Sequence, residues 1–60
     1  MTTIEQVKLE LAELQALGLP VPASALPYVD ANADEIEEYR ESGMKISEIA
    51  DLVRDLCSFA

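Results

Sequence analysis

The sequence predicts an all-α fold: a small bundle of three main helices, with room for a short fourth helical turn, completed by homo-oligomerisation. In three segments, apolar residues recur at steps of three and four, which is the period of one helix face. No segment alternates with the two-residue period of a strand. The 60 residues make one small acidic helical domain, 1–60. A chain this short hides only about 60% of its unfolded surface, so we expect self-association or very regular packing to stabilise it.

The first helix is predicted over residues 3–17, with signals at both ends. Thr2 with Glu5, or Thr3 with Gln6, has the spacing of a capping box, which satisfies free amide groups in the first turn. After the helix, Gly18 suits a left-handed terminal residue, Leu19 can complete a Schellman motif, and Pro20 prevents continuation. One apolar stripe runs along the helix, formed by Ile4, Val7, Leu11 and Leu14.

This first helix has apolar residues on a second side as well, and Leu17 widens the stripe. The second side contains Leu9, Ala12 and Ala16. A helix that is apolar on two sides is usually buried on two sides. The pattern favours a contact with a second copy. Leu11→Asp, in the first stripe, is expected to unfold or dissociate the protein. The alternative is a helix wedged between the other helices of one monomer.

Residues 19–24 form a connector that two prolines keep extended. Beyond it two arrangements are open. In the first, Ser24 caps one helix over 24–42, Pro27 lies in its first turn, and its stripe is Leu26, Val29, Ala33 and Ile36. In the second, a short helical turn ends near Asp30, and Asn32 caps a new helix with Glu35 as its reciprocal partner. We favour the break, because Asp and Asn prefer caps to helix interiors.

The last two helices are predicted over 33–42 and 46–58, separated by a stop at Ser42-Gly43. The final helix has a stripe of Ile46, Ile49, Val53 and Leu56, which Ala60 extends, with Leu52 and Phe59 at its flanks. The core or oligomer contact is therefore expected to comprise Ile4, Val7, Leu11, Leu14, Ile46, Ile49, Val53 and Leu56. Dimerisation would use the second side of the first helix or the Leu52/Phe59 flank.

Composition excludes several functions. Twelve acidic residues against four basic ones give a net charge of −8, which disfavours direct nucleic-acid binding because that needs Lys and Arg. With no His and one Cys, the chain offers no zinc site, no recognisable catalytic nucleophile and no cofactor motif. We expect a protein that is not an enzyme. No apolar run reaches the ~20 residues of a membrane span, and the N-terminus does not resemble a secretion signal. A lone Cys57, expected to be a buried inert thiol, suits a reducing compartment, so the expected location is the cytoplasm.

The segment Asp30-x-Asn32-x-Asp34, with Glu41 at the twelfth position, resembles an EF-hand calcium loop. That family wraps alternate oxygen ligands around the cation and closes the loop with a bidentate Glu. The match departs at the sixth position, where Glu35 stands in place of the glycine of the sharp turn. A capped acidic helix is the competing interpretation, and we predict no metal site.

Residues 36–53 resemble the opening of a helix-turn-helix unit: a helix ends at glycine, Ile46 packs inward, and Glu48-Ile49-Ala50 begins the next helix. The resemblance covers about a third of the chain. A DNA reader needs a further turn and a basic recognition helix, which this sequence lacks after Arg54. The resemblance thus implies a truncated DNA-associated regulator at most. A common helix hairpin explains the pattern equally well.

The densest charge predicts a partner-binding acidic face made of Asp34, Glu35, Glu37, Glu38 and Glu41. Carboxylates four apart on a helix repel one another, so stability alone does not favour this arrangement. We expect a small acidic regulator or inhibitor that binds a basic surface on another macromolecule, as inhibitors of phage or plasmid type do when they imitate nucleic-acid charge. Solubility alone is the competing explanation.

Overall fold

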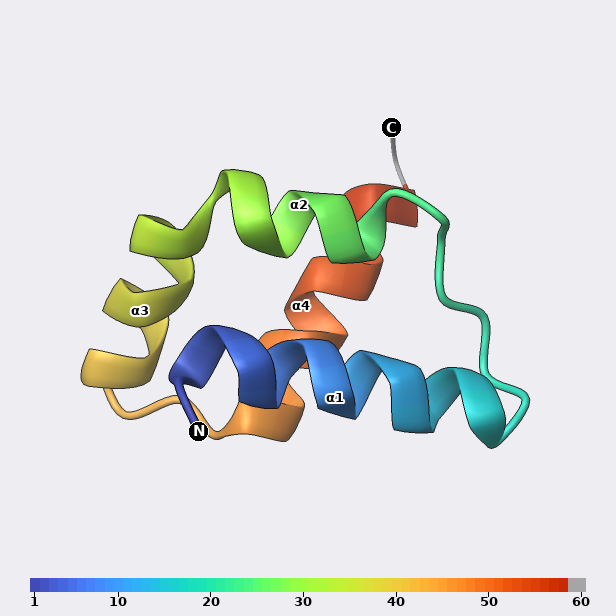
Figure 1. Ribbon diagram of the computed structural model, residues 1–60, viewed down its shortest axis with the longest axis horizontal. Coiled ribbons are helices and arrows are strands. Elements are labelled where there is room, and N and C mark those ends of the chain that lie inside the picture. Colours follow the sequence, from blue (N-terminus) through green and yellow to red (C-terminus); the bar gives the residue numbers. More distant parts are fainter. Residues whose placement is uncertain (59–60) are drawn as a thin grey trace.

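The computed structural model describes residues 1–58, which form four helices and no strand. They are α1 (Thr3–Ala16), α2 (Ala25–Ala31), α3 (Ala33–Glu41) and α4 (Ile46–Ser58). The four helices surround one core, and the Cα atoms span 28 × 22 × 16 Å. Figure 1 shows α3 at one end of the long axis and the connector between α1 and α2 at the other. The all-helical prediction is confirmed. No helix in the described part of the chain is long and apolar enough to cross a membrane.

The predicted cap at the start of α1 and the predicted turn at its end are both present in the structure. The Glu5 amide donates to Thr2 Oγ1 at 3.2 Å, and the Thr2 hydroxyl donates to Glu5 Oε1 at 3.1 Å. At the other end Gly18 takes a φ of +87°. The Leu19 amide donates to the Leu14 carbonyl at 3.1 Å, and the Gly18 amide donates to Gln15 at 3.0 Å. These two bonds define the expected Schellman motif.

The second helical segment is a complete helix of seven residues, longer than the single turn we expected. Its buried residues are Ala25 and Val29, four apart, whereas Leu26 is 39% exposed. Of the stripe expected for one continuous helix, Val29 and Ile36 are buried as predicted, whereas Leu26 was wrong and Ala25 takes its place in the core. The Ser24 side chain makes no capping bond. The connector itself is held to α4 by Arg54 Nε, which donates to the Pro20 carbonyl at 3.0 Å.

The chain breaks between α2 and α3 at Asn32, where φ is −119° and ψ is 35°. This confirms two helices in place of one over residues 24–42. The predicted capping box between Asn32 and Glu35 was wrong. Asn32 Nδ2 instead donates back to the Tyr28 carbonyl at 3.1 Å, so its side chain closes α2 and does not cap α3.

The turn between α3 and α4 has the same Schellman geometry as the turn that ends α1. Gly43 has a φ of +105°, and the Met44 amide donates to the Tyr39 carbonyl at 3.2 Å. The next helix is then capped by Glu48 Oε1, which accepts from the Lys45 amide at 2.9 Å. Because these bonds are local, the stop at Ser42-Gly43 could be predicted from the sequence.

The core contains nine buried residues contributed by all four helices. They are Val7, Leu11, Ala25, Val29, Ile36, Ile49, Ala50, Val53 and Cys57. Of the expected set, Val7, Leu11, Ile49 and Val53 are buried, while Ile4, Leu14 and Ile46 are partly buried and pack against the core.

Leu56 is a correction to the expected core, because it is 40% exposed. The buried side of α4 advances by fours from Ile49 through Val53 to Cys57, and this turns Leu56 outward. The buried Cys57 thiol agrees with the prediction. The expected contributions of Phe59 and Ala60 lie outside the described residues.

Candidate functional site: an acidic helix

The five predicted site residues all lie on α3, and all are exposed. The opposite side of this helix holds the buried Ile36 and the partly buried Tyr39, which pack against the core. We call the five exposed residues, Asp34, Glu35, Glu37, Glu38 and Glu41, the acidic face. The core contacts of α3 therefore keep these carboxylates in solvent at one end of the molecule (Figure 1).

The acidic face is not neutralised within the described chain. The two ion pairs of residues 1–58 are Lys8–Asp30 at 3.0 Å and Arg54–Asp51 at 2.9 Å, and neither involves α3. Arg40, the one basic residue of α3, donates from Nη1 to the Met44 carbonyl at 3.2 Å. Five carboxylates against one guanidinium give α3 a net charge of −4, half of the −8 of the chain.

Tyr28 of α2 lies close enough to the acidic face for the charge of Glu35 to affect its pKa. Partial burial raises the pKa of Tyr28, and the negative charge of Glu35 raises it further. Both effects oppose formation of a tyrosinate, which would add another negative charge beside α3.

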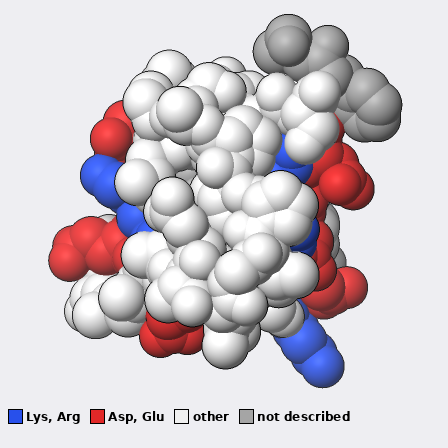
Figure 2. All heavy atoms as spheres, turned by 90° about the vertical axis from the view of Figure 1, so that its right-hand side faces the viewer, with Lys and Arg blue, Asp and Glu red and all other residues white. Residues whose placement is uncertain are grey.

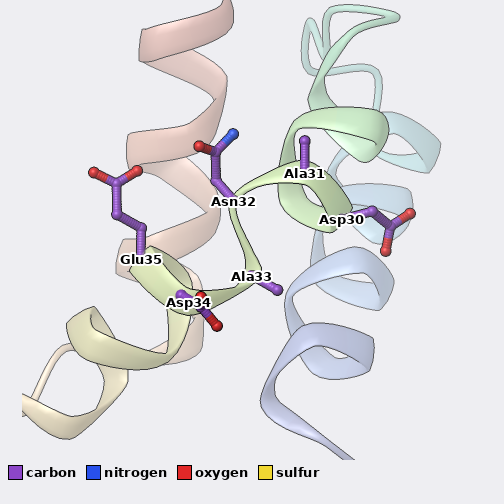
Figure 3. Close-up of a pocket in the computed structure, with 6 residues that line it drawn as sticks. All are labelled: Asp30, Ala31, Asn32, Ala33, Asp34 and Glu35. Atoms are coloured by element: carbon purple, nitrogen blue, oxygen red, sulfur yellow. The ribbon is translucent and has the colours of Figure 1, made fainter.

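A shallow hollow of about 480 Å³ lies where α2 meets α3, along the segment that resembles a calcium loop. Figure 3 shows that the side chains of Asp30, Asn32, Asp34 and Glu35 point in different directions instead of toward one centre. Asp30 is engaged by Lys8, through bonds of 3.1 and 3.0 Å to its two oxygens. No group of three possible metal ligands converges within the described residues. Because the segment is divided between two helices, it does not wrap around a point as the EF-hand loop does.

The helix-turn-helix resemblance corresponds to α3, the turn 42–45 and α4. The two helices and the turn between them are present as the resemblance implies, but α4 is itself acidic. It carries Glu48, Asp51 and Asp55 against Arg54, for a net charge of −2. Arg54 is engaged by Asp51 and the Pro20 carbonyl. This helix presents no row of cations to a phosphate backbone.

A second surface, which the sequence analysis missed, lies at the opposite end of the molecule from α3. Residues 14–29 contain no charged residue, and they form the end of α1, the connector and most of α2. In Figure 2 uncharged atoms fill the middle of this face, and charged side chains lie around its edge. We call six of its exposed apolar residues the uncharged end: Ala16, Leu17, Leu19, Pro20, Ala23 and Leu26. The signal in the sequence that could have indicated this surface is the uninterrupted run of uncharged residues over 14–29.

Fold and site together define a small all-α domain that is polarised, with an acidic helix at one end and an uncharged surface at the other. The chain matches no family model, no curated protein and no solved structure. Function must therefore be argued from the two surfaces themselves.

Proposed function

We propose that this protein is a small acidic, non-enzymatic interaction module, a regulator or inhibitor, that binds a basic surface of another macromolecule through α3. The observation that carries the proposal is the acidic face: five exposed carboxylates that form no ion pair within the described chain. A cationic partner would relieve the repulsion between carboxylates three and four residues apart. The summed field would also accelerate encounter with such a partner.

The partner class that fits best is a protein whose basic groove normally holds a nucleic-acid backbone. A rigid helix with closely spaced carboxylates presents a row of negative charge of the kind that such a groove attracts. Inhibition of phage or plasmid type would follow if the module occupied the groove in place of the nucleic acid. Because exposed charges are screened within about 8 Å at physiological salt, the binding should weaken steeply as salt rises.

The decisive experiment is capture of partners from a lysate of the source cell on immobilised protein, eluted with a salt gradient. The test variant is the triple substitution Glu37→Gln, Glu38→Gln, Glu41→Gln. Its matched control is Glu10→Gln, Glu13→Gln, Asp55→Asn, which removes the same three charges away from α3 and leaves both proteins at −5. We expect a basic protein to elute at moderate salt from the wild type and the control, and to be lost with the test variant.

Equal loss from both variants would show that only net charge matters and would contradict a role for α3. Salt-insensitive capture would contradict the electrostatic mechanism. A second candidate, a DNA-associated regulator, is favoured only by the α3-turn-α4 connection. It predicts a gel shift with bulk DNA, whereas the acidic module predicts none.

We also propose that the module acts in the cytoplasm and as a homo-oligomer. Cys57 is a buried free thiol, which suits a reducing compartment. Several leucines remain substantially exposed in the monomer, including Leu17 at 77% and Leu19 at 42%. They provide apolar surface that a second copy could cover.

A further inference from the structure

The uncharged end combines exposed apolar side chains with a backbone that is hydrogen-bonded at the Schellman turn and at the start of α2. Leu17, Leu19 and Leu26 are 77%, 42% and 39% exposed. The amides of Leu17, Gly18 and Leu19 donate within the Schellman turn, and the Ala25 amide donates to the Pro22 carbonyl at 3.0 Å. Prolines have no amide hydrogen, and the Pro20 carbonyl accepts from Arg54.

Charge determines which occupant suits this surface. Two copies with a net charge of −8 repel each other wherever their carboxylates approach. At the uncharged end the segment 14–29 has no charge, and Arg54, which donates to the Pro20 carbonyl of this end, is paired with Asp51. Glu13, which directly precedes the segment, forms no ion pair within the described chain. The acidic face lies at the far end of an axis 28 Å long, which is several screening lengths at physiological salt. End-to-end contact thus keeps the two acidic faces apart.

We propose that the uncharged end is the contact surface of a homodimer, in which two copies meet end to end around Leu17, Leu19 and Leu26 and present their α3 helices outward. This inference concerns the end opposite to the acidic face, and it holds whether or not that face binds a partner.

The size of the surface sets the strength of the dimer. Perpendicular to the long axis, the molecule measures 22 × 16 Å between Cα atoms. Such a face is small beside the about 800 Å² per partner of a standard stable interface. The dimer should therefore dissociate reversibly, with a dissociation constant in the micromolar range or weaker. The prolines keep the connector stiff, so little conformational entropy is lost on contact.

The test is sedimentation equilibrium of the full chain from micromolar to millimolar concentration, with Leu17→Glu and Leu9→Glu as a matched pair. Both residues are exposed leucines of the α1 region, and both substitutions give a net charge of −9, but Leu9 lies outside the uncharged end. We expect Leu17→Glu to raise the dissociation constant at least about tenfold and Leu9→Glu to change it by much less. Leu26→Glu on α2 is a second test variant, and circular dichroism establishes that each variant keeps its helices.

Small-angle scattering adds a test of shape, since an end-to-end dimer should be nearly twice as long as the monomer. A protein that stays monomeric at all concentrations would overturn the proposal. So would a dimer that survives both Leu17→Glu and Leu26→Glu. A dimer lost only with Leu9→Glu would also overturn it, and would place the contact on the second apolar side of α1.

Discussion

Two leucines of α1, only two residues apart, occupy opposite environments. Leu11 is fully buried in the core, whereas Leu9 is 49% exposed. Because both residues are leucines in the same helix, the same substitution at each position isolates the effect of burial on stability.

Leu11→Asp should unfold the protein. Loss of a buried leucine typically costs about 2–5 kcal/mol, and an unpaired buried carboxylate adds to that cost. A domain of this size has only about 3–5 kcal/mol of stability to lose. Circular dichroism should show loss of helical signal for Leu11→Asp and retention of it for the control Leu9→Asp. A Leu11→Asp variant with wild-type helicity and mass would contradict the core described above.

Tyr28 should ionise at higher pH than an ordinary tyrosine, because burial and Glu35 raise its pKa. As pH rises past about 10, tyrosine in the unfolded chain loses its proton before the folded one does. The folded state then binds more protons, so the free energy of unfolding falls with pH between the ordinary and the raised pKa. Absorbance at high pH, taken as wild type minus Tyr28→Phe, should give a midpoint above 10. A midpoint at or below 10 would contradict the burial of this hydroxyl.

At the scale of the helices, the points where helices begin and end were the most predictable part of the fold, because they depend on local sequence signals. Thr2, Gly18 and Gly43 perform the roles expected of them, since a cap or a left-handed turn depends on neighbours in sequence. By contrast, the side chain of Asn32 had two possible backbone partners, and it bonds to Tyr28 instead of capping α3.

The faces of the helices were less predictable than their ends. Leu56 and Cys57 were both expected to be buried, and only Cys57 is, because the buried residues of α4 advance in steps of four beyond Ile49. The seven residues of α2 span fewer than two full periods, so their buried side could not be identified from spacing alone. The acidic face could be located because an acidic residue seldom lies in a core. The uncharged end was missed, because it forms only when the connector brings α1 and α2 together.

Gly18→Ala should lower the free energy of unfolding by about 1 kcal/mol. The glycine has a φ of +87°, and no atom lies within 4 Å of an added Cβ, so the cost is that of the backbone conformation alone. Gly18→Asn should cost less, because Asn tolerates the left-handed region better than Ala. Urea denaturation of the three proteins provides the comparison. Equal stabilities would show that the turn at Gly18 does not require its positive φ.

At the scale of the whole molecule, negative charge is concentrated rather than spread. α3 carries −4, while the segment 14–29 carries none. The two ion pairs are largely exposed and contribute at most about 1 kcal/mol each. Repulsion among the carboxylates should therefore dominate the effect of salt on stability.

Raising sodium chloride from low to physiological concentration should increase the melting temperature, because screening weakens that repulsion. The Glu37→Gln, Glu38→Gln, Glu41→Gln variant should melt higher than the wild type at low salt and should respond less to added salt. Thermal melts followed by circular dichroism give both quantities. A melting temperature that falls with salt would show that the ion pairs outweigh the acidic face.

The packing of α1 against α4 has a consequence for synthesis. Val7 and Leu11 of α1 share the core with Ile49, Val53 and Cys57 of α4, which come 38 to 50 residues later in the chain. Until the ribosome has produced and released α4, the apolar side of α1 has no lasting cover. The domain therefore completes its core only after α4 has emerged, and until then the apolar side of the nascent first helix is partly exposed.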